Sequence, residues 1–287
     1  MTNEGKRQVF KVQKMHIFKN NELFIIDLDG VVYEGNTPIA NAVESINKLR
    51  SSGKKIAYFT NNATLTPEDY KNKLAGMGII AEAYQIYTSA IVCVQSLKDM
   101  YERNEAAFVV GEDGLLNAIA GAEFSVLNGK YEYDEIIKNK TIKTNFVVAG
   151  LDRFITYKKL AAAALLISRG AKFYASNTDA TLPDTSGLLP GAGSIVAFLS
   201  TASGINPEKI FGKPYPEGIK QILNAFLCPP NKAVIVGDRL NTDILCGKNA
   251  KINTALVLTG ITQKEDIQKL PIEFTPDYIL NDLSEIF

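Results

Sequence analysis

The chain has 287 residues, of which 46% are hydrophobic and 22% are charged, as is ordinary for a globular protein. Its 31 basic and 31 acidic residues cancel, which argues against a nucleic acid or a membrane surface as a partner, because both favour a basic excess. Cys93, Cys228 and Cys246 show no paired spacing, which is typical of a reducing compartment. Because no signal peptide or long apolar stretch is visible, we expect a cytoplasmic protein.

Residues 1–22 are polar and basic and contain the single histidine, His16, so we expect an arm without a function and a chemistry that does not use histidine. Beyond residue 22, short runs rich in β-branched and aromatic residues alternate with segments of helical spacing. The predicted strands are 23–26, 56–59, 107–110, 146–149, 172–175, 233–236 and 255–258. The predicted helices include 39–51, 67–77, 156–169 and 215–226, the second with Thr66 as N-cap and Pro67 at its first position.

This alternation predicts an α/β fold, a Rossmann-like, doubly wound parallel sheet with helices on both faces. Three of its predicted strands end in polar residues, which are Asp27 and Asp29, then Thr60, Asn61 and Asn62, and finally Asp238 and Asp243. Since the carboxyl ends of parallel strands meet at one edge of a sheet, we expect these side chains to lie together. A loop before the helix at 215–226 would add Lys213.

Four carboxylates crowded against one lysine would repel one another, so such a site needs a cation. An all-oxygen ligand set without histidine or cysteine favours Mg²⁺. The cation and Lys213 would attract a phosphate dianion, whose other oxygens could bind Thr60 and Asn61. Residues i and i+2 of an extended segment point the same way, so one carboxylate of the Asp27–Asp29 pair could attack phosphorus while the other moves protons.

The motifs that carry these residues are DLDGVVY, TNN, GKPYP and GDRLNTDI, in that order along the chain. They resemble the four motifs of the haloacid dehalogenase-like (HAD) hydrolase superfamily, and within it the NagD-like, 4-nitrophenylphosphatase-type phosphatases. The resemblance extends over nearly the whole chain from residue 23 onward. It implies a Mg²⁺-dependent phosphatase that acts on small phosphomonoesters through an aspartyl-phosphate intermediate.

The resemblance also implies a role for each motif residue. Asp27 would be the nucleophile and a metal ligand, and Asp29 would be the general acid and base, with its backbone carbonyl on the metal. Asp238 would be the third protein ligand of the metal, and Asp243 would orient a bound water or Lys213. The residues implied to bind the phosphoryl group are those of the second and third motifs, Thr60, Asn61, Asn62 and Lys213.

Spacing predicts an inserted domain independently of the family. Only about 30 residues separate Asp29 from Thr60, but about 150 separate Asn62 from Lys213, which is room for a complete domain. We expect a core of 1–86 and 187–287 and an insert of 87–186, with GLLPGAGSI (187–195) as the turn back to the core. The insert is similar to the C2-type cap of NagD-like phosphatases, whose substrate-facing N-x-D loop Asn177 and Asp179 match.

Other functions stay open at this point. A phosphomutase would use the same aspartyl-phosphate chemistry, although mutase relatives usually carry their cap between the first two motifs. A catalytically idle phosphate-binding protein could keep the same pocket. A dehalogenase would need neither Asp29 nor a metal, a transport ATPase of the superfamily would carry threonine at the position of Asp29, and a receiver-type switch would be far shorter. The natural substrate cannot be read from the motifs, and a homodimer is left open.

Overall fold

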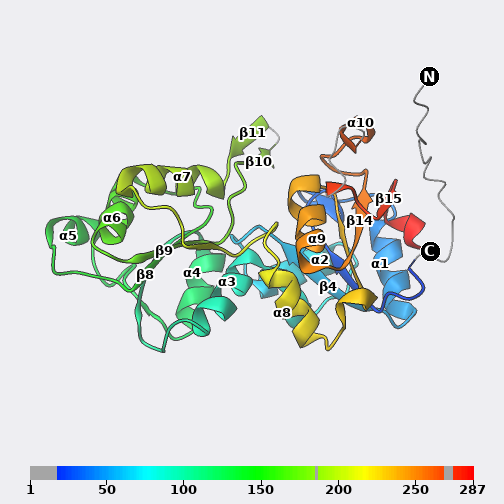
Figure 1. The fold of residues 1–287 in the computed structure, drawn as a ribbon, viewed down its shortest axis with the longest axis horizontal. Helices are drawn as coiled ribbons and strands as arrows, with labels where there is room; N and C mark the ends of the chain where they lie inside the picture. Colours follow the sequence, from blue (N-terminus) through cyan, green and yellow to red (C-terminus); the bar gives the residue numbers. More distant parts are fainter. Residues whose placement is uncertain (1–17, 185–186, 268–273) are drawn as a thin grey trace, which may run out of the picture.

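The structure is a computed structural model and describes residues 18–184, 187–267 and 274–287. Two sheets of parallel strands lie in two neighbouring lobes of the molecule (Figure 1). The first sheet has the spatial order β15 (Tyr278–Leu280), β14 (Asn253–Val257), β13 (Ala233–Gly237), β1 (Leu23–Ile26), β4 (Lys55–Thr60) and β5 (Ile86–Thr88). The second has the order β12 (Lys209–Ile210), β9 (Lys172–Ala175), β8 (Phe146–Ala149), β6 (Ala106–Val110) and β7 (Ser125–Val126).

Helices cover these sheets and make up most of the rest of the described chain. The α-helices are α1 (Ala42–Ser51), α2 (Pro67–Gly76), α3 (Ser89–Lys98), α4 (Asp113–Gly121), α5 (Tyr133–Lys138), α6 (Tyr157–Ser168), α7 (Ala192–Ser203), α8 (Glu217–Ala225), α9 (Leu245–Ala250) and α10 (Lys264–Ile267). Short helical turns are η1 (Ala83–Gln85), η2 (Pro230–Lys232), η3 (Leu240–Ile244) and η5 (Leu283–Ile286). Two antiparallel hairpins complete the fold, β2 (Tyr33–Glu34) with β3 (Thr37–Pro38) and β10 (Thr181–Asp184) with β11 (Gly187–Pro190).

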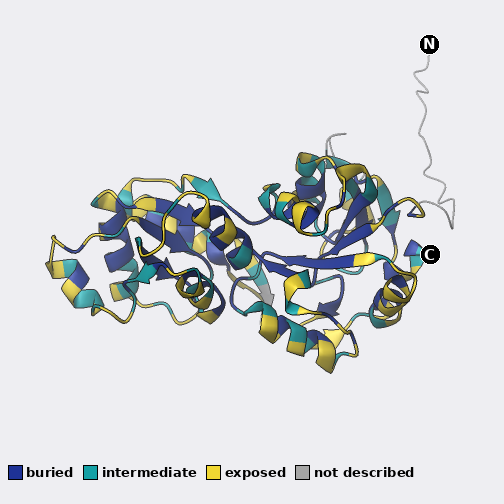
Figure 2. Ribbon diagram, turned by 90° about the horizontal axis from the view of Figure 1, so that it is seen from below, coloured by how far each residue is buried: buried dark blue, intermediate teal, exposed yellow. Residues whose placement is uncertain are grey.

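The first sheet is buried on both faces, which explains why its strands are continuous apolar runs. β1 lies between β13 and β4, with Ile25 opposite Ile235 and Ala57. Alternate residues of β1 enter different cores, so that Phe24 packs with α1, α2 and η5, while Ile25 packs with α3, α8 and α9. Figure 2 shows the buried strands inside each lobe and the exposed outer surfaces of the helices.

One hydrophobic cluster continues from the first sheet into the second. It contains Phe59 of β4 and Ile219 of α8, and it extends through α3 and α4 to Val109 of β6 and Phe146 of β8. The opposite face of the second sheet is covered by α5, α6 and α7 around a separate cluster. The two lobes are therefore joined by packed side chains as well as by the chain that crosses between them.

The predicted α/β fold with a parallel core sheet and an inserted cap is confirmed. Each of the seven predicted strands forms, with bounds that lie within two residues of the expected ones. Thr66 caps α2 by accepting a hydrogen bond from the amide of Asp69, and Pro67 opens that helix, as predicted. The three cysteines are buried and form no disulfide. Residues 1–17 of the expected arm, which include His16, lie outside the described residues, whereas Phe18 is buried against Phe24 and Tyr278.

Strand pairing places the return of the chain to the first sheet later than residue 187. Residues 187–190 form β11 of a hairpin rather than a turn, α7 packs on α6, and β12 pairs with β9 of the second sheet. The physical reason is that β12 has two residues and is held by its partner strand, so it leaves no pattern of its own in the sequence. Residue 186, the expected end of the insert, lies outside the described residues, and the exact limits of the cap stay a prediction.

Candidate active site

The carboxyl ends of β1, β4 and β13 bring the predicted polar residues to one edge of the first sheet. β1 pairs in parallel with both other strands, and the amide of Asp27 extends the ladder by donating to the carbonyl of Val236 at 2.9 Å. Carboxylate oxygens of Asp27, Asp238 and Asp243 all lie within 4.8 Å of one another. Residues 211 positions apart in the sequence, Asp27 and Asp238, thus become neighbours because parallel strands end at the same edge.

Lys213 provides the positive charge of this cluster. Its side chain is 2% exposed, and its Nζ lies 2.7 Å from Asp27 Oδ1 and 2.6 Å from Asp243 Oδ1. The same ammonium donates to the carbonyl of Phe59 at 3.0 Å. Burial lowers the pKa of Lys213, but the two carboxylates outweigh it and raise that pKa above the ordinary value. Lys213 therefore stays protonated and shares one charge between two carboxylates.

Asp238 has no cation of its own in this cluster. It is 1% exposed, its Oδ2 accepts from the amide of Ile261 at 2.8 Å, and its Oδ1 is buried without a hydrogen-bond partner in the described chain. Burial and then the charge of Asp243 raise the pKa of Asp238 to about 6. Burial and Asp243 likewise raise the pKa of Asp27, against the opposing effect of Lys213. The cluster holds more negative charge than its one lysine can balance.

This arrangement fits a hard divalent cation. Three carboxylates converge, and the unpaired Oδ1 of Asp238 is a buried oxygen that a metal ion would satisfy. The backbone is shaped around the same group, because a Cβ on Gly30, whose φ is +81°, would lie 2.6 Å from Asp238 Oδ2. Position 30 therefore needs glycine, both for the left-handed backbone and for the close approach.

Asp29 differs from the three clustered carboxylates. It is exposed, and its carboxylate is not part of the group that converges within 4.8 Å. The surrounding protein raises the pKa of Asp29 by desolvation, while Lys73, Lys213 and Arg239 lower it. An exposed carboxyl beside a buried one is an arrangement in which the two groups can do different chemical work.

Asn61 lies at the centre of a hydrogen-bond network. Its Oδ1 accepts from the amide of Lys213 at 2.7 Å, and its Nδ2 donates to the carbonyl of Lys213 at 3.0 Å and to both carboxylate oxygens of Asp179 at 3.1 Å. The carbonyl of Asn61 accepts from Ser89 Oγ at 2.6 Å and from Asn177 Nδ2 at 2.8 Å. Ser89 begins α3, and Asn177 follows β9, so Asn61 connects the crossing into the second lobe and the segment after β9 to the lysine loop.

Several of the side chains predicted to bind phosphate already form hydrogen bonds with other protein groups. The side-chain amide of Asn61 is engaged by protein groups, and Asn62 Oδ1 accepts from the amide and the hydroxyl of Thr64 at 3.0 and 2.8 Å. Thr60 Oγ1 accepts from the amide of Asn62 at 3.1 Å. Asn177 is buried and bonded inside the network rather than open to a ligand. Phosphate binding by these residues stays a prediction, and their observed contacts are those of residues that shape the site.

A pocket of about 280 Å³ opens beside Lys213. Its other lining residues come from the segment after β9, from the lysine loop and from the segment that begins η3, and they are Thr178, Asp179, Ala180, Thr181, Pro214, Arg239, Asn241 and Thr242. Sequence reasoning gave Arg239 no role, although its place directly after Asp238 at a strand end was a usable signal. The buried hydroxyls of Tyr33 and Tyr70 were also missed; they have no hydrogen-bond partner in the described chain, and burial followed by Asp29 raises the pKa of each.

Comparison with known proteins relates this site to a family. Residues 24–125 match the family model described as haloacid dehalogenase-like hydrolase, and residues 210–286 match a second model described as HAD-hydrolase-like. The chain is 36% identical to an acid sugar phosphatase of Staphylococcus saprophyticus, over 93% of this chain and 97% of that one.

Solved structures agree with the sequence matches. A crystal structure of a 4-nitrophenylphosphatase from Thermotoga maritima superposes with a TM-score of 0.85 at 31% identity, covering 95% of this chain and 98% of the other. A glycerol phosphate phosphatase from Mycobacterium tuberculosis, crystallised in complex with magnesium, also has a TM-score of 0.85 at 31% identity, covering 95% of this chain and 78% of the other.

Proposed function

Because the chain belongs to the haloacid dehalogenase-like hydrolase family and is a phosphoric monoester hydrolase, we propose that it is a Mg²⁺-dependent phosphatase that forms an aspartyl-phosphate on Asp27. The observation that carries this proposal is the buried cluster of Asp27, Asp238 and Asp243 around a single lysine. The repulsion among these buried carboxylates is offset only if a cation binds between them, and such a cation would also attract an anionic substrate.

In the first half of the proposed reaction, a carboxylate oxygen of Asp27 forms a bond to phosphorus as the bond from phosphorus to the ester oxygen breaks. Asp29 donates a proton to the departing oxygen, which leaves as an alcohol. The ammonium of Lys213, 2.7 Å from Asp27 Oδ1, offsets negative charge that would otherwise repel the phosphate.

In the second half, Asp29 takes a proton from a water molecule, whose oxygen attacks phosphorus and displaces the Asp27 carboxylate. Inorganic phosphate leaves, and both aspartates return to their starting states. Burial raises the pKa of Asp29, which favours the protonated form that can donate to the departing oxygen.

We propose that Asp27 and Asp238 hold the metal ion with their carboxylates and that Asp29 does so with its backbone carbonyl. Asp243 then keeps Lys213 in place, as its 2.6 Å contact supports. When bound, Mg²⁺ supplies positive charge that draws the phosphate in and stabilises the charge that develops at phosphorus.

The proposed substrate is a small phosphomonoester. The pocket of about 280 Å³ is lined by the cap residue Asp179 and by Arg239 and Lys213 of the core, a size and lining that suit a small polar molecule. The named activities of the relatives, toward sugar phosphates, glycerol phosphate and 4-nitrophenyl phosphate, support the same class. Within the described residues, none of the helices has the length and apolarity to cross a bilayer, and we propose a cytoplasmic location.

The test is phosphate release from a panel of small phosphomonoesters, measured with Mg²⁺ and with EDTA. We expect wild-type release that requires Mg²⁺ and a loss of more than about a thousandfold in Asp27→Asn, because the amide is a poor nucleophile. The matched control is Asp99→Asn, an exposed aspartate after α3, which should keep wild-type activity.

Two results would count against the proposal. Phosphate release that is the same in EDTA would show that the reaction needs no metal ion. Release that survives in Asp27→Asn would show that the reaction does not pass through an aspartyl-phosphate on Asp27. Trapping of a phosphorylated peptide that contains Asp27, detected by mass spectrometry after rapid acid quench, would identify the intermediate directly. Transfer of phosphate to a second site of the substrate, without release, would indicate a phosphomutase instead.

A further inference from the structure

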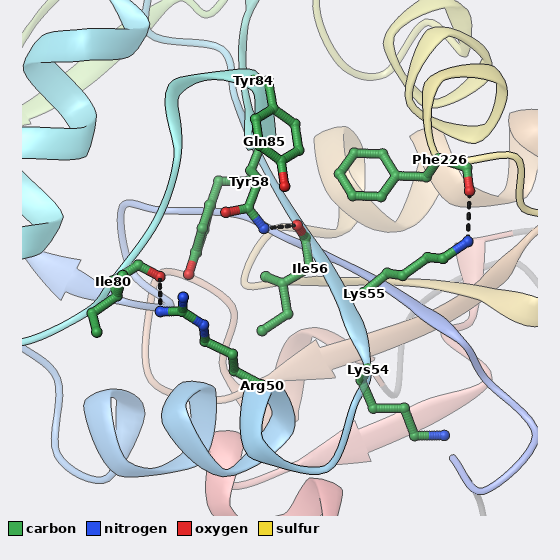
Figure 3. Close-up of a pocket in the computed structure, with 9 residues that line it drawn as sticks. All are labelled: Arg50, Lys54, Lys55, Ile56, Tyr58, Ile80, Tyr84, Gln85 and Phe226. Carbon is green, nitrogen blue, oxygen red and sulfur yellow. Dashed lines mark hydrogen bonds between the residues drawn. The ribbon is translucent and has the colours of Figure 1, made fainter.

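A second pocket, of about 200 Å³, lies at the other end of β4 from Thr60 (Figure 3). It forms where the first sheet has an incomplete edge, because β5 begins only opposite Tyr58 and leaves the start of β4 with a neighbouring strand, β1, on one side only. The side chain of Gln85 satisfies part of that edge by donating to the carbonyl of Ile56 at 2.8 Å. The end of α1 and the residue after α8 form the other walls.

The charged side chains of this second pocket are all cationic. Arg50 donates through Nη1 to the carbonyl of Ile80 at 3.0 Å, and Lys55 Nζ donates to the carbonyl of Phe226 at 2.7 Å. In the described part of the chain neither cation forms an ion pair, and no carboxylate lines the pocket. Glu22 is close enough to interact electrostatically with Lys55, but its carboxylate forms an ion pair with Lys232 at 2.5 Å. The pocket therefore carries uncompensated positive charge.

Lys54 contributes less to the pocket than its two neighbours. Its Nζ donates to the carbonyls of Lys19 and Asn21 at 3.1 and 2.6 Å, and Figure 3 shows it turned away from Tyr58 and Arg50. Arg50, in contrast, uses one of the five N–H donors of its guanidinium and keeps the rest for a ligand.

Tyr58 adds a hydroxyl group to the lining of the same pocket. The residue is 1% exposed, yet its hydroxyl forms no hydrogen bond within the described chain. Figure 3 shows this hydroxyl directed toward the guanidinium of Arg50. Burial raises the pKa of Tyr58, with Arg50 lowering it in part, so the hydroxyl stays protonated and can donate. Because this hydroxyl lines the pocket and reaches solvent there, it is open to an acceptor on a ligand.

We propose that this second pocket binds a small phosphate-type dianion, either inorganic phosphate or the phosphate group of a small ester. Arg50 and Tyr58 would donate to its oxygens, and Lys55 would add charge from the opposite wall. A tetrahedral dianion offers acceptors in several directions and matches a guanidinium well. At the rim, Tyr84 is 71% exposed and its ring centroid lies 6.4 Å from that of Phe226, which provides an aromatic surface for the organic part of an ester.

This binding site is separate from the catalytic one and does not rest on the proposed reaction. The experiment is calorimetric titration in EDTA with inorganic phosphate and, in a second arm, with adenosine 5′-monophosphate. Without a metal ion the catalytic end repels anions, since its aspartates outnumber Lys213, so the titration reports on the second pocket. The variants are Arg50→Gln and Tyr58→Phe, and the matched control is Lys220→Gln, an exposed lysine of α8 outside this pocket.

We expect one saturable site in wild type, with affinity about tenfold weaker in Arg50→Gln, about threefold to tenfold weaker in Tyr58→Phe and within about twofold of wild type in Lys220→Gln. Tighter binding of the nucleotide than of phosphate would support an ester as the ligand, and equal or weaker binding would support free phosphate. The proposal is overturned if neither probe saturates the wild type, or if both pocket variants keep wild-type affinity while circular dichroism shows them folded.

Discussion

The two parallel sheets of this protein treat charge at their carboxyl ends in different ways. In the second sheet, the carboxylates that follow β6 and β8 each have a cation of their own, Glu112 with Arg153 at 2.8 Å and Asp152 with Lys159 at 2.6 Å. In the first sheet, one lysine is shared by two carboxylates, and Asp238 has no ion pair among the described residues.

The two sheets share an architecture and differ in the balance of charge at their strand ends. Both sheets bring strand ends together, but paired charges neutralise one another and stay structural, whereas an excess of buried carboxylates creates a demand for a cation. The candidate active site therefore lies at the sheet edge where buried carboxylates outnumber the cation beside them.

The largest expected effect is on Lys213→Met, compared with Lys159→Met in the cap. Each change removes the cation that pairs with a buried carboxylate, and each should destabilise the protein by about 3 kcal/mol because that carboxylate loses its partner. Lys213→Met should also lower kcat by about a thousandfold or more, since Asp27 and the phosphate lose their common counter-charge. Urea unfolding and steady-state kinetics measure the two effects. Equal loss of kcat in both variants would show that stability, rather than the charge on Asp27, limits turnover.

Asn61→Ala and Asn128→Ala test two asparagines with the same hydrogen-bond pattern. Asn61 bridges the amide and carbonyl of Lys213, and Asn128 bridges the amide and carbonyl of Val109 at 2.8 Å each. Either change should cost about 2 kcal/mol of stability, because buried backbone groups lose partners. A fall in kcat of about a hundredfold is expected for Asn61→Ala alone, since small misplacements of a catalytic group are costly. Wild-type kcat in Asn61→Ala would contradict the role of Asn61 in positioning Lys213.

Asp238→Asn and Glu112→Gln should have opposite effects on the stability of the metal-free protein. Folding raises the pKa of Asp238 to about 6, so the folded state binds more protons and stability falls as the pH rises from about 4 to about 6. In EDTA at pH 7, Asp238→Asn should therefore stabilise the protein by about 2 kcal/mol, with little gain at about pH 4.

The contribution of Glu112 to stability changes with pH in the opposite direction. Burial raises its pKa, but the bonds from Arg153 outweigh burial and lower it, so the pair stabilises the protein above the unfolded pKa and loses that contribution as the pH falls. Glu112→Gln should destabilise the protein at pH 7. Thermal unfolding in EDTA across this pH range checks both variants, and a destabilised Asp238→Asn would contradict the excess of negative charge.

The smallest effect concerns two helix caps, one for each sheet. Thr66 accepts from the amide of Asp69, whose carboxylate accepts from the amide of Thr66 in return, while Thr156 accepts from the amide of Lys159 without such a return bond. Thr66→Ala should cost about 1 kcal/mol, and Thr156→Ala should cost less. Urea unfolding at neutral pH measures the difference, and a larger loss in Thr156→Ala would mean that tertiary contacts outweigh the return bond.

Elements with a strong pattern of their own were predictable, and elements held by their partners were not. The run LFII and the run AVIV become β1 and β13 as expected, because a long apolar run can only be buried. β5, β7 and β12 have two or three residues each, and neighbouring strands stabilise them. The later return of the chain to the first sheet was missed for this reason, since β12 decides it.

The same division holds within the active site. Asp27, Asp29, Asp238, Asp243 and Lys213 were predicted as a group, because strand ends and loop spacing assign them to one edge of a parallel sheet. The hydrogen bonds of Asn61 were not predictable, because its partner Lys213 is 152 residues away and the contact depends on side-chain direction.

The amino-acid sequence by itself determined the α/β class of this protein, the edge of the sheet that carries its candidate site and the residue types found there, because hydrophobic periodicity and the residues that end each strand can be read locally along the chain. The tertiary structure alone decided that Lys213 serves both Asp27 and Asp243, that Asp238 keeps an oxygen without a partner among the described residues, and that Asn61 joins the start of α3 to the segment after β9. The physical reason is that pairing among charges and hydrogen-bonding groups depends on distances of a few ångströms, which only the packed fold sets.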